Sequence, residues 1–271
     1  MALAVCVLHE LDLEPGAPGL VLTADPVVRV PWEECRRALG GADPESAAGR
    51  RRLADHLLAR RWCADAGPER LTAALRPLGL PAGHPCHPGA SWVRERVLGD
   101  CLELGFGAVG LDPGDPDQVV VVPPEALAQL GLSPDALWPP VRGELERLGA
   151  LAGERVRLDP KGALRPFGDC DALTLLGARS LRRALCAAAG GMVAAVVPMR
   201  RRGWTRLTGI DPAFGPAAAA ATDPAERGFA RPLLLTVDEV TQVAPGGAPH
   251  RTVLLDPPLE DRAHRDVLYG R

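Results

Sequence analysis

Three consecutive arginines, Arg200, Arg201 and Arg202, follow an apolar run in the C-terminal half of the chain, and Trp204 and Arg206 come directly after them. Guanidinium groups pair with phosphate or carboxylate in a forked geometry, and an indole can stack on a base or on an arginine. We therefore expect these five residues to lie at the end of a strand and to bind an anionic small molecule or an acidic protein surface.

The same arginines have a structural alternative, because basic runs are often solvated surface. Ion pairs with Asp211, Asp238 or Glu239 would use these charges inside the fold. Lys161 is the only lysine, and arginine, alanine, glycine and proline are abundant, which we interpret as the bias of a GC-rich bacterial genome. Arginine number alone is therefore weak evidence for a binding site.

A second candidate site consists of four acidic residues, which are Asp169, Asp171, Asp238 and Glu239. Two carboxylates in a DxD pattern on an extended backbone point to one side, as metal-dependent phosphoryl and nucleotidyl transfer requires. The alternative function is therefore an enzyme that uses a divalent metal and acts on a phosphorylated or nucleotide substrate. The segment GDCDALTLL, however, leads into an amphipathic stretch, so helix capping by Asp169 or Asp171 is the favoured interpretation.

His84, Cys86 and His87 form a third candidate, because imidazole and thiolate are zinc ligands. Zinc would need a fourth ligand with a regular spacing, and the sequence has no CxxC, HxxxH or HExxH. Pro85 and Pro88 flank these residues, so we interpret the segment 79–90 as an exposed linker.

Other catalytic patterns are missing or incomplete. The sequence has no GxSxG, and an acid on each side of Cys170 disfavours its thiolate. The glycines of 105–110 match GxGxxG, but LDPGDPD follows and cannot form the helix that a dinucleotide site requires.

The elements that would position these residues follow from hydrophobic periodicity and turn signals. The expected strands and helices make the fold α+β, with mixed α/β possible, as a single globular unit of short β-segments and amphipathic helices. We expect extended segments at 3–13, 20–30, 96–111, 118–123, 192–198, 233–240 and 252–255, and helices at 43–62, 68–76, 133–152 and 172–188.

Three details of this scheme are specific. We expect Asp43 to cap the helix that it opens, and the two prolines at 139 and 140 to interrupt the helix that begins near Pro134. The helices at 43–62 and 172–188 should turn their leucines inward and their arginines outward, including Arg60 and Arg182. A tentative domain boundary separates a hairpin and helical portion, residues 1–80, from a mixed portion, residues 81–271.

Composition limits the remaining functions. The formal net charge of −3 does not favour a nucleic-acid coat, and no apolar run is long enough for a membrane span. Seven cysteines without a CxxC pair are typical of reduced thiols, so we expect a cytoplasmic protein. A further alternative is a structural subunit of an assembly, with interface anchors among four of its five tryptophans, which are Trp32, Trp62, Trp92 and Trp138.

Overall fold

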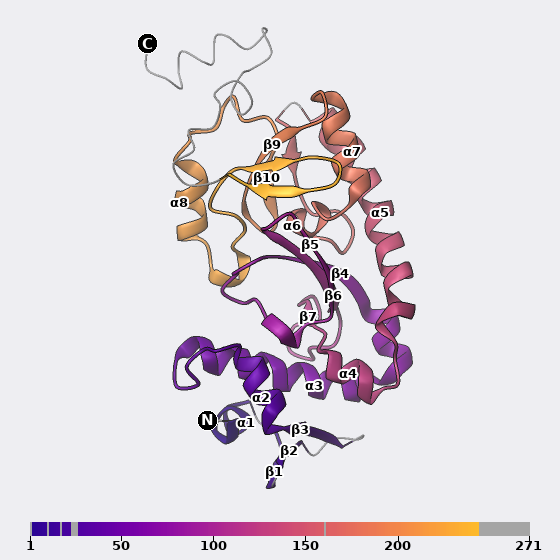
Figure 1. Ribbon diagram of the computed structural model, residues 1–271, viewed down its shortest axis with the longest axis vertical. Coiled ribbons are helices and arrows are strands. Elements are labelled where there is room, and N and C mark those ends of the chain that lie inside the picture. The colour runs from indigo at the N-terminus through magenta and orange to yellow at the C-terminus, as the bar shows by residue number, and fades with distance from the viewer. Residues whose placement is uncertain (1, 10, 17, 23–26, 160, 244–271) are drawn as a thin grey trace. The chain divides into compact units, whose positions relative to one another are not determined.

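The computed structural model describes residues 2–9, 11–16, 18–22, 27–159 and 161–243 (Figure 1). The fold is mixed α+β, as expected, with short strands and amphipathic helices. Contacts within the chain divide it into two units. Unit 1 consists of Met1–Leu78, Pro85–Glu95 and Gly105–Arg142, and unit 2 consists of Gly79–His84, Arg96–Leu104 and Gly143–Arg271. Whether residues 1–80 and 81–271 behave as separate domains stays a prediction.

Unit 1 begins with a helix and a three-stranded antiparallel sheet in the order β1-β2-β3. The elements are α1 (Ala2–Leu8), β1 (Leu13–Gly16), β2 (Gly19–Leu22) and β3 (Val28–Pro31). The extended conformation expected over 3–13 is wrong for its first part, which is helix α1. Val5 and Cys6 are buried there while Val7 and Leu8 are exposed, and such a short apolar run does not separate helix from strand.

The helix expected at 43–62 exists but is longer, because α3 covers Ala47–Ala74. Its N-cap is Ser46, whose hydroxyl accepts a hydrogen bond from the Gly49 amide at 3.0 Å, so the capping role expected for Asp43 is wrong. A break at Gly67, where φ is 68°, separates the two helices that the sequence predicts. Only glycine adopts this backbone conformation without strain, and Pro68 then starts the second helical part.

Four more strands follow: β4 (Leu75–Pro81), β5 (Arg94–Leu98), β6 (Leu102–Ala108) and β7 (Val120–Val121). The order is β4-β6-β5, with β7 paired to β6. The extended segment expected at 96–111 is therefore a pair of strands. Gly105 of β6 lies against the Trp92 indole, where a Cβ would be 2.2 Å from the ring, so there is no room for a larger residue.

The interpretation of 79–90 as an exposed linker is wrong at several positions. Gly79–Pro81 belongs to strand β4, and His84 and His87 are 4% and 8% exposed. His84 Nε2 lies 3.1 Å from the Arg227 carbonyl oxygen in unit 2. In unit 1 the His87 ring contacts Trp92 edge-on at 5.4 Å. Both rings are held by tertiary contacts, which the local proline and glycine content does not reveal.

Unit 2 contains a five-stranded antiparallel sheet in the order β12-β11-β9-β10-β8. Its strands are β8 (Ala163–Leu164), β9 (Val193–Met199), β10 (Arg202–Trp204), β11 (Leu233–Leu235) and β12 (Val240–Gln242). Its other elements are the helices α6 (Ala172–Leu175), α7 (Arg179–Ala188) and α8 (Phe214–Ala221) and the 3-10 turn η2 (Pro224–Glu226). The strand expected at 252–255 lies outside the described residues.

Helix α5 (Pro134–Leu158) begins where expected but continues through Pro139 and Pro140, so the predicted interruption is wrong. Leu137 and Val141 lie on either side of the prolines and are buried in the core of unit 1. Burial of these two side chains offsets the backbone hydrogen bonds that the prolines cannot make.

The helix expected at 172–188 is split into α6 and α7, and Arg182 is buried rather than outward. Arg182 donates from Nη1 to the Leu176 carbonyl at 2.6 Å and from Nε to the Val237 carbonyl at 3.1 Å. In a continuous helix, the Leu176 carbonyl would accept a hydrogen bond from an amide of the next turn. The break between α6 and α7 leaves this carbonyl without that partner, so it can accept from Arg182. Arg182 therefore joins α7 to the turn before it and to the loop before β12.

Candidate functional site

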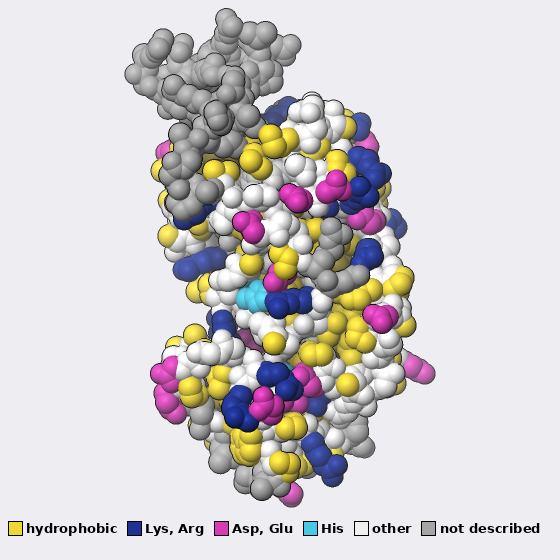
Figure 2. All heavy atoms as spheres, in the orientation of Figure 1, with side chains coloured by type: hydrophobic (Ala, Val, Ile, Leu, Met, Phe, Trp, Pro, Cys, Tyr) yellow, Lys and Arg dark blue, Asp and Glu magenta, His cyan; other side chains and the backbone are white. Residues whose placement is uncertain are grey.

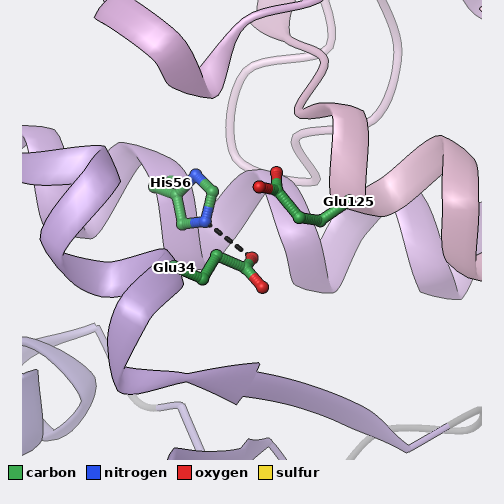
Figure 3. A group of neighbouring side chains, drawn as sticks. All are labelled: Glu34, His56 and Glu125. Carbon is green, nitrogen blue, oxygen red and sulfur yellow. Dashed lines mark hydrogen bonds and ion pairs between the residues drawn. The ribbon is translucent and has the colours of Figure 1, made fainter.

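Three helices of unit 1 bring Glu34, His56 and Glu125 together (Figure 3). Glu34 comes from α2 (Trp32–Leu39), His56 from α3, and Glu125 from α4 (Pro124–Gln129). One donor atom from each side chain lies within 4.8 Å of the other two. Among the described residues, this is the one group of three or more His, Cys, Asp or Glu side chains that could hold a metal ion.

The centre of the cluster is the Glu34 carboxylate, which is 2% exposed. Its Oε1 atom lies 2.8 Å from His56 Nε2 and also 2.8 Å from Arg60 Nε. His56 and Arg60 are 5% and 4% exposed. An ionised carboxylate at this depth requires compensation, and both close contacts fall on the same oxygen of Glu34.

The two carboxylate oxygens of Glu125 differ in their hydrogen-bond partners. Its Oε1 atom accepts from Arg37 Nη2 at 3.0 Å, and Arg37 is itself half exposed. Its Oε2 atom is buried and has no hydrogen-bond partner among the described residues. A buried carboxylate oxygen without a donor is costly, and a water molecule, an ion or a ligand bonded to it would remove this cost.

Arg60 also has unmet hydrogen-bonding capacity. Its Nη2 donates to the Arg29 carbonyl at 3.2 Å, whereas Nη1 is buried and has no partner among the described residues. Nε is close to Glu34, but its N–H direction does not meet hydrogen-bond geometry, so the contact is an ion pair by distance alone. The guanidinium thus neutralises Glu34 while keeping N–H groups for another acceptor.

The local sequence explains how these residues point inward. His56 and Arg60 are four residues apart, so they share one face of α3 with the buried Leu53 and Leu57. The outward position expected for Arg60 is therefore wrong. A histidine inside the buried stripe of α3 was the available signal, whereas nothing in the sequence around Glu125 marks it as a site residue.

Two cysteines next to the cluster, Cys35 and Cys63, have protonated thiols. Burial raises the pKa of Cys63 to about 12, and burial together with the charge of Glu34 raises the pKa of Cys35 to about 11. Both side chains are neutral thiols at physiological pH. The donor atoms that lie together in the cluster are carboxylate oxygens and an imidazole nitrogen.

The arginine run of unit 2 lies at the turn between β9 and β10, which pair antiparallel (Figure 1). Arg200 is half-buried and forms an ion pair with Asp171, 2.6 Å from Nη2 to Oδ2. Arg201 is exposed and its Nε lies 3.6 Å from Glu226. The guanidinium of Arg202 lies 5.7 Å from the centre of the Trp204 ring.

The remaining sequence-predicted site residues are dispersed. Asp171 caps α6 by accepting from the Thr174 amide at 2.6 Å, as the capping interpretation expects. Asp238 pairs with Arg179 at 2.8 Å, and Glu239 and Asp169 are exposed. The one group of described residues that could hold a metal ion includes none of these four acids, and it does not include His84, Cys86 or His87. Arg206 is exposed on the segment after β10.

Side chains of both signs are interspersed on the face shown in Figure 2, and no field of a single sign covers it. Among the described residues, no helix is long and apolar enough to cross a membrane. Comparisons with protein-family models, with curated proteins and with solved structures find no match to this chain.

Proposed function

We propose that this protein binds a divalent transition metal ion in unit 1, with Glu34, His56 and Glu125 as its protein ligands. The observation that carries this proposal is Glu125 Oε2, a buried carboxylate oxygen that has no donor within the described part of the chain, on a side chain that lies beside an imidazole and a second carboxylate. Imidazole together with carboxylate suits zinc, and three protein ligands leave one coordination position open.

Arginines support the proposed ligands from outside the centre. Arg60 lies against Glu34 and Arg37 against Glu125, in each case at one oxygen, Oε1. Partners of this kind fix the orientation of a ligating carboxylate and are typical of metal centres. Donor atoms of a tetrahedral zinc site are roughly 3.4 Å apart, so donors within 4.8 Å need only side-chain adjustments.

The experiment measures zinc affinity in protein that has been stripped with a chelator. We expect one zinc ion per chain, and an affinity at least about tenfold lower in Glu125→Gln, which removes the charge but keeps the shape. Glu33→Gln is the matched control, because Glu33 is the exposed neighbour of Glu34 on the same helix. It should bind zinc like the natural sequence.

A buried ion-pair network without a metal is the competing interpretation of the same residues. It is supported if stripped protein takes up no zinc, or if zinc binds equally well to Glu125→Gln. Thermal denaturation gives a second readout, because a free zinc concentration about 100 times the Kd should stabilise the folded state by about 2.7 kcal/mol.

Anion binding at the β9–β10 turn is a second candidate function, and the exposure of Arg201 and Arg202 favours it. Arg202 is already positioned over an indole, where an anion or a base would find both charge and a flat surface. The test is the double substitution Arg201→Gln and Arg202→Gln, which spares the Arg200–Asp171 ion pair. Phosphate or nucleotide binding that is retained by this folded variant would contradict an anion site at the turn.

A further inference from the structure

One face of α5 is used inside unit 2. Its buried side chains belong to the core of this unit, and they are Leu145, Leu148, Ala152 and Val156. Gly149 and Gly153 bring α5 close to α7 and its N-cap, because a Cβ at these glycines would lie 2.2 Å from Ala178 Cβ and 2.7 Å from Ala184 Cβ. The opposite face of α5 is therefore the one turned to solvent.

Two leucines lie on that opposite face. Leu151 and Leu158 are 45% and 84% exposed. Seven residues make about two helical turns, so both side chains lie on one side of α5. The solvent face of a surface helix is normally polar, and apolar residues repeated at this spacing are typical of a helix that pairs with another helix. The leucines therefore point to a helix as the partner of this face.

Two ion pairs flank Leu151 along the same face. Glu144 and Arg147 are 2.6 Å apart, and Glu154 and Arg157 are 3.3 Å apart, with all four side chains 41–62% exposed. In chain order the charges are acid, base, acid, base. In the reverse direction they are base, acid, base, acid. A second copy of α5 that runs antiparallel therefore presents the opposite sign at the level of each charge.

An antiparallel pair with its two-fold axis beside Leu151 uses both features. Leu151 then meets Leu151 of the second copy, and Arg147 is level with Glu154 of that copy. Leu158 is level with Gly143 of the second copy, where a Cβ would have no described atom within 4 Å outside its own helix, so there is room for the leucine. In a parallel pair, the arginines at 147 would face each other and so would the glutamates at 154. The charges therefore favour the antiparallel arrangement.

We propose that α5 forms the interface of a symmetric homodimer, in which two copies of the chain pair antiparallel through the face between Gly143 and Leu158. Such an interface is self-complementary, as a two-fold axis requires. The face is about 22 Å long. A contact of this size is at the small end of specific interfaces, so we expect a reversible dimer with a Kd of about 1–100 µM. The proposal does not depend on the metal centre, whose ligands lie in unit 1.

Analytical ultracentrifugation of the full chain tests the dimer, over concentrations from about 1 to 300 µM that bracket this Kd. The average mass should rise with concentration from that of one chain toward that of two. Leu151→Glu places two like charges at the axis and should raise the Kd at least about tenfold. Val97→Glu is the matched control, because Val97 is also 45% exposed in unit 2 but lies on β5. It should form dimers like the natural sequence.

A mixture of two variants tests the order of the charges. Arg147→Glu alone sets acid against acid, and Glu154→Arg alone sets base against base. Each should stay monomeric at concentrations where the natural sequence is a dimer. Mixed in equal amounts, the two variants restore opposite charges at both contacts, so a heterodimer should form. This restoration also shows that both variants are folded.

Three results would overturn the proposal. The first is a natural sequence that keeps the mass of one chain at every concentration. The second is a dimer that Leu151→Glu leaves intact, because its interface would lie elsewhere. The third is a mixture that stays monomeric, because the antiparallel order of charges predicts its association. Should Leu151→Glu fail to fold, Leu158→Glu at the exposed end of the helix replaces it.

Discussion

Each unit contains an arginine that the helical pattern predicts to be outward and that is buried instead. In unit 2, Arg182 is 1% exposed and donates to two backbone carbonyls, at 2.6 and 3.1 Å. In unit 1, Arg60 is also buried and lies against Glu34, but two of its nitrogens have no acceptor among the described residues, and Glu125 Oε2 in the same cluster has no donor there. Burial of a charge is therefore not in itself a sign of function, whereas several unsatisfied polar atoms in one cluster mark a candidate site.

The largest expected effect is the loss of stability in Arg182→Leu, which tests whether Arg182 has a structural role. Arg182→Leu leaves the carbonyls of Leu176 and Val237 without their donor, and each buried unmet carbonyl costs roughly 1–3 kcal/mol. We expect the free energy of unfolding to fall by about 2–6 kcal/mol, the sum of the two losses. Urea denaturation with and without zinc measures it, and the loss should be the same in both conditions. A loss that zinc restores would connect Arg182 to the metal centre and contradict the contrast.

Glu125→Gln should have little effect on the stability of the metal-free protein and a large effect on zinc binding, in contrast to Arg182→Leu. The substitution weakens the half-exposed ion pair with Arg37, but it also removes the charge from a carboxylate whose Oε2 atom has no donor among the described residues. We therefore expect the stability of the metal-free protein to change by no more than about 1 kcal/mol. The stabilisation by zinc should disappear in this variant. A variant that is strongly destabilised without metal would mean that Glu125 is a structural residue like Arg182.

An intermediate, pH-dependent effect is expected at the start of α7. Glu146 accepts from the amides of Arg179 and Ser180, at 2.8 and 2.7 Å, in place of an N-cap side chain. Partial burial acts to raise the pKa of Glu146, but these hydrogen bonds outweigh it, so the pKa is lowered. A lowered pKa contributes stability above the unfolded value of about 4.3, and this contribution is lost as pH falls through the folded value.

Glu146→Gln should therefore cost about 1 kcal/mol at pH 7, the usual contribution of a helix cap, and progressively less as the medium becomes acidic. Denaturant unfolding at a series of pH values from 7 to 3 checks this. A cost that stays constant through acid pH would show that the charge of Glu146 is not what stabilises α7.

The smallest effect is expected at the β9–β10 turn. Arg201 and Arg202 are exposed, so replacing both with Gln should change the free energy of unfolding by no more than about 0.5 kcal/mol. Arg200→Gln should cost more, because it breaks the half-buried ion pair with Asp171. Equal losses from the two variants would remove the distinction between the structural and the solvent-facing arginines of this run.

Much of the fold was predictable from local patterns, and the candidate site was not. The periodicity of residues 43–62 predicts a helix, and the apolar run at 192–198 predicts the strand that is β9. These features depend on neighbours in the sequence. The ion-pair partner of Arg60 is Glu34 on another helix, and Glu125 is farther still along the chain. The periodicity of one helix therefore cannot predict that these residues meet.

The same limit explains the errors in side-chain orientation. A helical pattern that assigns leucines to the core and arginines to solvent is correct for Leu53 and Leu57 and wrong for Arg60. Tertiary partners decide whether an arginine is buried, because a buried guanidinium requires acceptors that the sequence does not place. At Asp171 the local rule was sufficient, since a helix cap bonds to an amide three residues away.

X-ray absorption at the zinc edge is the most direct test of the proposed metal centre, because it reports the atoms bound to the ion. Glu34, His56 and Glu125 predict a first shell of nitrogen and oxygen only, at about 2.0–2.2 Å, with the outer-shell signature of one imidazole. Glu33→Gln should give the same spectrum, and His56→Gln should lose the imidazole signature. A sulfur shell near 2.3 Å would contradict the proposal, since it would place zinc on a cysteine such as Cys86 instead.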